Sequence, residues 1–238
     1  EPTHKRTSTR TILFIKKPMA KVNFSPYSGN LTNVWAAIKA TGGQINFDEA
    51  YRQLTGATVN WAPDTGYQVG LLCSGDKGNR IEMNRGGSAI GFYMNNLTDL
   101  VFRDMVIHGM VSGGATPDCA AAIYGSYVRA MKIESCVIAG IRTAAGNAVI
   151  HAGTSSWLHL NHLQLGGHTA DAVARLDGGY GLLAEDATFY DYQTIGNVYH
   201  SKTPGGVGAW IDAINAPAGN GASEPMVTVR FCQFDEGA

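Results

Sequence analysis

The stretch that decides the fold is Leu100–Gly109, with the sequence LVFRDMVIHG. Its first apolar pair, Leu100 and Phe102, is separated by one residue. Two further residues follow, and then comes a second apolar pair with the same spacing, Met105 and Ile107. The further copies are MKIESCVIAG from Met131, LHLNHLQLGG from Leu158, YDYQTIGNVY from Tyr190 and VTVRFCQFDE from Val227. A pattern that recurs at roughly thirty-residue intervals indicates a repeat architecture in which equivalent residues stack.

A second pattern precedes the first. A pair of apolar residues stands upstream of each copy, at Ala89-Ile90, Ala122-Ile123, Val149-Ile150, Leu182-Leu183 and Trp210-Ile211. Alternation over four to five residues predicts short strands, and the two-residue break predicts a bend between two of them. The spacers are too short for the helices of regular βαβ units, although the loop 166–178 could hold a short one. The sequence therefore predicts an all-β fold, a single-stranded parallel β-helix with about three strands per coil, right-handed by the crossover rule.

This prediction assigns residues to columns, because equivalent positions of parallel strands lie about 4.8 Å apart on successive coils. The inward columns are Leu100, Met131, Leu158, Tyr190 and Val227; Phe102, Ile133, Leu160, Tyr192 and Val229; and Met105, Cys136, Leu163, Ile195 and Cys232. Cys136 and Cys232 are then core residues three coils apart, beyond the reach of a disulfide.

The chain divides into three parts. Residues 1–29 are expected to form an arm or linker, 30–44 a capping helix, and 45–238 the β-helix, with Gln44–Phe47 as its first strand. Thr32 or Asn33 can cap the helix and Gly42-Gly43 can end it. No cap follows the last copy, so we expect this end of the solenoid to be covered by more of the chain or by another chain.

Composition excludes several classes of protein. The 18 basic and 19 acidic residues give a net charge of −1, which argues against a nucleic-acid partner. No apolar run is long enough for membrane insertion. The four cysteines form no C-x-x-C pair, the histidines are scattered, and no phosphate-binding loop is found, so neither a metal site nor a cofactor is expected.

Polar residues in the outward columns supply a first candidate site. These columns are predicted as Val101, Lys132, His159, Asp191 and Thr228, and as Arg103, Glu134, Asn161, Gln193 and Arg230. Lys132, Glu134, His159 and Asp191 would then form a polar groove with an acid, a base and a cation. The alternative is a solvated outer face, or a contact between subunits with paired charges.

The upstream strand supplies a second candidate site. Its outward column is predicted as Gly91, Tyr124, His151, Ala184 and Asp212, with Glu185 and Asp186 beside it. Tyr124 could stack on a pyranose ring. Glycoside hydrolysis usually needs two carboxyl groups, and the candidates are Glu185, Asp186, Asp191 and Asp212, assisted by His151 or His159. Lys132, Glu134, Tyr124, His151 and His159 are the candidate substrate-binding residues. The alternative is that the acidic residues face solvent or cap a turn.

Two segments, NVWAAIKATGGQINF and NLTDLVFRDMVIHG, resemble the right-handed parallel β-helix (pectate-lyase-like) superfamily. The resemblance covers about residues 31–238 and is greatest to bacteriophage tailspikes and capsule depolymerases. It implies a homotrimer in the phage tail of a virion, made in the host cytoplasm and joined to other virion proteins through the N-terminal arm. Its ligand would be a bacterial surface polysaccharide, which it binds for host attachment and can cleave. The chain departs from the pattern at SPYSGNLTN, where an Asp-Gly-x-x-Asp-Asp-Thr stretch is usual.

Two other functions fit the same sequence. The β-helix could be a structural virion component without catalysis, such as a decoration, fibre or baseplate part. It could also be a secreted, extracellular polysaccharide lyase. The β-helix fold serves hydrolases, lyases and non-catalytic adhesins alike, so the fold does not choose among them.

Overall fold

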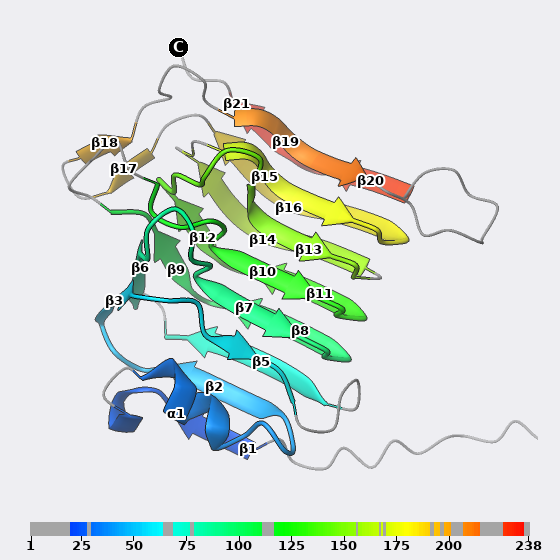
Figure 1. Cartoon of the computed structure of the whole chain (residues 1–238). Coiled ribbons are helices and arrows are strands. Elements are labelled where there is room, and N and C mark those ends of the chain that lie inside the picture. The colour runs from blue at the N-terminus through cyan, green and yellow to red at the C-terminus, as the bar shows by residue number, and fades with distance from the viewer. Residues whose placement is uncertain are drawn as a thin grey trace, which may run out of the picture.

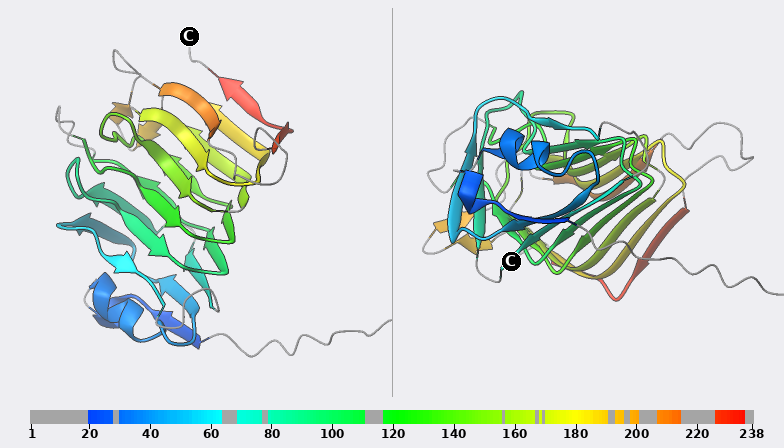
Figure 2. Two further views of the ribbon diagram at one scale, coloured as in Figure 1. Left: turned by 45° about the vertical axis from the view of Figure 1, so that its right-hand side comes forward. Right: turned by 90° about the horizontal axis from the view of Figure 1, so that it is seen from below.

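The computed structural model describes residues 20–27, 30–63, 69–76, 79–110, 117–155, 157–166, 168, 170–190, 193–195, 198–200, 207–214 and 226–235. In this part of the chain, parallel strands wind into a right-handed β-helix whose coils stack along one axis (Figures 1 and 2). Each full coil passes through three faces, named A, B and C in the order in which the chain visits them. The predicted fold class is confirmed.

Face A carries the first strand of each coil. Its strands are β1 (Ala20–Asn23), β2 (Gly43–Phe47), β5 (Gly70–Gly75), β8 (Asp99–Arg103), β11 (Ala130–Glu134), the first halves of β14 (Trp157–Gly166) and β16 (Gly181–Tyr190), and β20 (Met226–Arg230). Alternate residues of these strands point inward, as the alternation predicts: Leu100, Met131 and Leu158 are consecutive in one column.

Face B follows after a short bend. Its strands are β3 (Tyr51–Thr55), β6 (Arg80–Asn84), β9 (Val106–His108), β12 (Val137–Ala139), the second halves of β14 and β16, and β21 (Gln233–Asp235). Because β14 and β16 continue round the bend, they join faces A and B into one hydrogen-bonded sheet.

Face C completes each coil. Its strands are β4 (Asn60–Trp61), β7 (Phe92–Asn95), β10 (Ile123–Ser126), β13 (Ala148–Gly153), β15 (Ala170–Asp177) and β19 (Val207–Ile214). All these strands pair in parallel, so their paired residues line up in columns from coil to coil.

Left-handed residues make the bends. Between faces A and B, the residue with positive φ occupies the same place in five coils: Asp104, Ser135, His162, Asp186 and Phe231 have φ between 50° and 55°. Between faces C and A the equivalent residues are Asn96, Tyr127, Thr154 and Gly178. Non-glycine residues adopt this conformation only when their surroundings impose it. Strand ladders on both sides of each bend impose it here, and the repeated geometry keeps the columns aligned.

The N-terminal end is covered by helix α1 (Leu31–Ala36) and by β1, which lie at one end of the coil stack (Figure 1). Leu31, Val34 and Ile38 are buried as predicted, and Trp35 stacks on Trp61 with ring centroids 5.5 Å apart. The helix is shorter than expected, and its N-cap is Asn30, whose side chain accepts from the Asn33 amide.

The expected arm does not end where the sequence suggested. Its residues 20–23 already form β1, paired with β2, and a 3-10 helix (η1, Ser25–Tyr27) follows. Phe24 is fully buried between them. Within the described ranges, no helix is long and apolar enough to cross a membrane.

The fourth copy of the repeat was placed wrongly. Leu182, not Tyr190, pairs with Leu158, and Ala184 and Ala187 take the positions predicted for Tyr192 and Ile195. The segment from Gln193 instead contains an antiparallel hairpin of β17 (Gln193–Ile195) and β18 (Val198–His200). A hairpin strand also alternates with a period of two, so the pattern alone could not separate it from a coil strand.

Two members of the face C column were also assigned wrongly. Ile123, Ile150 and Ile211 share a column as predicted, but its other members are Phe92 and Ala174, not Ile90 and Leu182. The loop 166–178, which could have held a short helix, contains the strand β15. Its alternating residues Ala172, Ala174 and Leu176 point inward; two of them are alanines, which give a weak hydrophobic signal.

Candidate functional site

Face C presents a continuous polar column to the outside. Tyr93, Tyr124, His151, Arg175 and Asp212 are consecutive Cα partners on β7, β10, β13, β15 and β19. This set, with the neighbouring Asp177, is called the face C site below. Tyr124, His151 and Asp212 were predicted to share this column, and they do.

The rings of the site pack edge to face. The centroids of Tyr93 and Tyr124 lie 5.4 Å apart, and those of Tyr124 and His151 lie 4.6 Å apart. Gly153 makes room for the second contact, because a Cβ atom at Gly153 would lie 2.6 Å from the Tyr124 hydroxyl oxygen. A larger residue at position 153 would therefore displace the Tyr124 ring.

His151 is the most constrained group of the site. Its side chain is 12% exposed, and neither ring nitrogen has a hydrogen-bond partner in the described part of the chain. Nε2 lies 3.9 Å from Oδ2 of Asp177. Burial and the charge of Arg175 lower the pKa of His151, against the opposing effect of Asp177 and Asp212. The lowered pKa favours the neutral imidazole at pH 7. Both ring nitrogens are buried, so a ligand could bond them only after a local movement of side chains.

Arg175 and Asp212 form the polar end of the column. Arg175 Nε donates to Oδ2 of Asp212 at 2.8 Å, and Nη1 donates to the carbonyl of Gly146 at 2.9 Å. Burial raises the pKa of Tyr124, so its hydroxyl stays protonated at neutral pH. The site thus holds a neutral base, a phenolic acid, a guanidinium and two carboxylates.

Lys132, Glu134, His159 and Glu185 lie on face A, in two adjacent outward columns. Lys132 and Arg103 both pair with Glu134. Glu185 Oε2 lies 3.7 Å from His159 Nε2 and 3.1 Å from Arg230 Nη2. Glu185 occupies the position predicted for Gln193, because the fourth copy begins at Leu182.

The charges on face A neutralise one another. Burial by itself would raise the pKa of Glu134, but hydrogen bonds from Lys132 and Arg103 lower it overall. Burial and the charge of Lys132 lower the pKa of His159. This arrangement is a ladder of ion pairs within the chain.

The remaining candidate carboxylates lie elsewhere. Asp186 is the left-handed residue of the bend between faces A and B, and its Oδ2 lies 2.7 Å from Nδ1 of His162 on the preceding coil. Tyr124 and His151 lie on face C, so the prediction that Asp186 lies beside them is wrong. Glu185 was predicted there too and lies on face A. Asp191 lies outside the described residues.

Sequence reasoning missed three members of the site. The predicted column placed Ile90 where the structure has Phe92, so Gly91 was assigned to the site in place of Tyr93. Arg175 and Asp177 were assigned to a loop. The alternation of ADAVARLD could have revealed the last two, because Arg175 and Asp177 fall between inward residues. No cluster of three or more metal-ligating side chains is found among the described residues.

Comparisons of the chain with protein families, curated proteins and solved structures found no match.

Proposed function

We propose that the protein binds a polysaccharide along face C. The observation that carries this proposal is the face C column itself, in which aromatic, imidazole, guanidinium and carboxylate groups follow one another on successive coils. A site of this kind suits a long polar ligand, because its aromatic rings can stack on sugar rings and its polar groups can bond hydroxyl groups. Convergent polar groups next to aromatic surface are typical of ligand sites.

The same groups could cleave the bound chain. A general base must be unprotonated at the working pH, and the lowered pKa of His151 favours that form. Asp177 and Asp212 would serve a hydrolase, while His151 and Tyr124 would serve a lyase as base and acid. Binding of the polysaccharide is therefore the main proposal, and its cleavage is an additional one.

The proposed ligand is a bacterial surface polysaccharide, and the proposed setting is a homotrimeric phage tailspike. Two observations support this setting. The repeat and cap segments resemble such proteins. The last described coil also exposes Val227, Val229, Phe231 and Phe234, and either association or more of the chain would bury this apolar surface. Attachment to other virion proteins through the N-terminal arm belongs to the same proposal; residues 1–19 lie outside the described ranges.

The test is binding to a panel of capsular polysaccharides and lipopolysaccharide O-chains, followed for the full chain and for Tyr124→Ala, His151→Ala and Asp212→Asn. Each variant is expected to weaken binding by about tenfold or more, since each lost good contact costs at least about 1.4 kcal/mol. His162→Ala is the matched control, because this histidine also lies near an aspartate but is on the bend between faces A and B, outside the face C site. Loss of binding in the control alone, or unchanged binding in all three site variants, would refute the face C site.

Cleavage is measured separately on any polysaccharide that binds. New reducing ends without an unsaturated product indicate a hydrolase, and absorbance from an unsaturated sugar indicates a lyase. Binding without either product supports an adhesin.

A structural virion component is the second candidate. The ion-pair ladder of face A favours it, because Glu134 and Glu185 are both engaged by cations of the chain itself. A protein that binds no polysaccharide but assembles stably would fit this function.

A further inference from the structure

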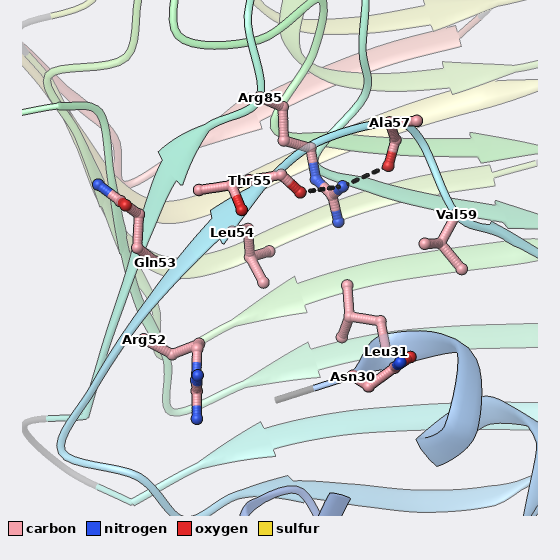
Figure 3. Close-up of a pocket in the computed structure, with 9 residues that line it drawn as sticks. All are labelled: Asn30, Leu31, Arg52, Gln53, Leu54, Thr55, Ala57, Val59 and Arg85. Carbon is pink, nitrogen blue, oxygen red and sulfur yellow. Dashed lines mark hydrogen bonds between the residues drawn. The ribbon is translucent and has the colours of Figure 1, made fainter. Parts of the chain in front are cut away.

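A pocket of about 370 Å³ lies near the N-terminal end of the solenoid (Figure 3), and its lining includes no residue of the face C site. It is bounded by the start of α1, by β3 and by the segment that joins β3 to β4. The lining residues are Asn30, Leu31, Arg52, Gln53, Leu54, Thr55, Ala57, Val59 and Arg85. Two of them are arginines and none is acidic.

Arg85 is the unusual member of this set. It is 9% exposed, and its Nη1 atom donates to the carbonyls of Ala57 and Thr55 at 2.6 and 3.2 Å. Its Nε atom is buried without a partner, and no carboxylate within the described ranges pairs with it. The remaining edge of the guanidinium points toward Leu31, across the pocket (Figure 3).

A buried cation without a counter-ion is costly, and buried charges in proteins are therefore normally paired. Backbone carbonyls compensate the charge of Arg85 only in part. Burial lowers the pKa of the guanidinium from its ordinary value, yet an arginine stays protonated in proteins. The unmatched positive charge and its free donor edge both adjoin the pocket.

Arg52 differs, although it lines the same pocket. Its Nε and Nη2 atoms donate to both carboxylate oxygens of Glu49 at 2.5 and 2.6 Å. This pair neutralises Arg52 locally, so Arg85 supplies the unmatched charge. Gln53 donates its Nε2 to Glu82 at 2.5 Å, which leaves the amide oxygen of Gln53 as an acceptor.

We propose that this pocket binds an oxyanion group, a carboxylate, sulfate or phosphate, carried on a small polar molecule. The Arg85 guanidinium would donate to the anion, since its planar fork matches such groups. Asn30 and Gln53 would bond the neutral part of the ligand. The site is independent of polysaccharide binding on face C, and either can exist without the other.

The test uses the full chain labelled with ¹⁵N and titrated in separate arms with inorganic phosphate, sulfate and acetate, at constant ionic strength set by sodium chloride. The Nε–H resonance of Arg85 is expected to shift with saturation. The arm with the tightest binding identifies the oxyanion. Charge-assisted hydrogen bonds contribute roughly 1.5 to 3 kcal/mol, so Arg85→Gln should weaken binding about ten- to hundredfold.

Two further variants keep the proposal falsifiable if Arg85→Gln does not fold. Val59→Trp fills the pocket while it leaves Arg85 in place, and it should abolish saturable binding. Arg80→Gln is the matched control, because Arg80 is an exposed arginine on β6 that does not line the pocket, and it should change affinity by less than about threefold. Shifts that do not saturate, or that persist unchanged in Val59→Trp, would overturn the proposal.

Discussion

His151 combines two properties that oppose each other, burial and the capacity to carry a charge. In the folded protein its side chain is 12% exposed and its pKa is lowered by burial and by Arg175. In the unfolded chain the pKa of a histidine is about 6.5. Protonation therefore favours the unfolded state, so the free energy of unfolding falls as the pH drops below about 6.5 toward the folded pKa.

This linkage gives a prediction for His151→Gln. The wild-type chain should lose free energy of unfolding between pH 7.5 and pH 5.5, and the variant should lose less of it. Each unit by which the folded pKa lies below the unfolded one corresponds to about 1.4 kcal/mol. The measurement is urea denaturation at both pH values. Tyr124→Phe keeps the imidazole and should retain the wild-type pH dependence. An equal change in the free energy of unfolding between the two pH values in all three proteins would show that His151 does not cause the pH dependence.

At the scale of elements, the segments between faces B and C need anchors, because they leave the strand ladders. Asp118 is one such anchor and is fully buried. Its carboxylate accepts from the amide and guanidinium of Arg142, at 2.8 Å and 2.7 Å, and from the amide of Met110 at 3.3 Å. One carboxylate thus fixes the segments of two successive coils.

Replacing Asp118 with Ala should lower the free energy of unfolding by about 2 to 4 kcal/mol, because it leaves buried donors without an acceptor. Chemical denaturation measures the change. Glu49→Ala is the comparison, since it removes a more exposed ion pair with Arg52 and should cost about 1 kcal/mol or less. Similar losses of unfolding free energy for the two substitutions would show that burial does not determine the contribution of Asp118 to stability.

Helix α1 covers the first coil through a few side chains. Trp35 is 5% exposed and packs on Trp61, which is fully buried. Trp35→Ala is expected to cost about 3 to 5 kcal/mol and to increase binding of a hydrophobic dye, because it opens the end of the core. Thr32→Ala changes an exposed residue of the same helix and should leave both readouts near wild type. A stable Trp35→Ala protein would mean that α1 is dispensable as a cap.

The whole molecule has unlike ends. The first coil is covered by α1 and β1, whereas the last described coil exposes apolar side chains, among them Phe231 at 83%. Apolar surface gathered on one end favours association, since its burial contributes about 25 cal/mol per Å². The two ends of the described solenoid therefore differ in the apolar surface that they expose.

Light scattering should accordingly find a mass above that of the monomer, and the tailspike proposal specifies a trimer. A double change, Phe231→Lys and Phe234→Lys, should shift the protein toward the monomer, while Tyr51→Lys, an equally exposed aromatic on face B, should not. A monomeric wild-type chain at micromolar concentration would remove the homotrimer and leave the binding function of face C to be judged alone.

The sequence by itself determined the coil, its three strands and most inward columns, because period-two alternation and repeat spacing are properties of the chain. Positions such as Leu100, Met131 and Leu158 could be aligned without coordinates. The same alignment of equivalent repeat positions placed Tyr124, His151 and Asp212 in one column.

Only the tertiary structure decided which alternating segment enters a column. Strand β16 and the hairpin β17–β18 share one periodicity, and hydrogen bonding to β14 selects Leu182 for the coil. That choice moved Glu185 to face A and brought Arg175 and Asp177 to His151. The pocket beside Arg85 was likewise invisible in the sequence, because its walls come from α1 and from two different coils.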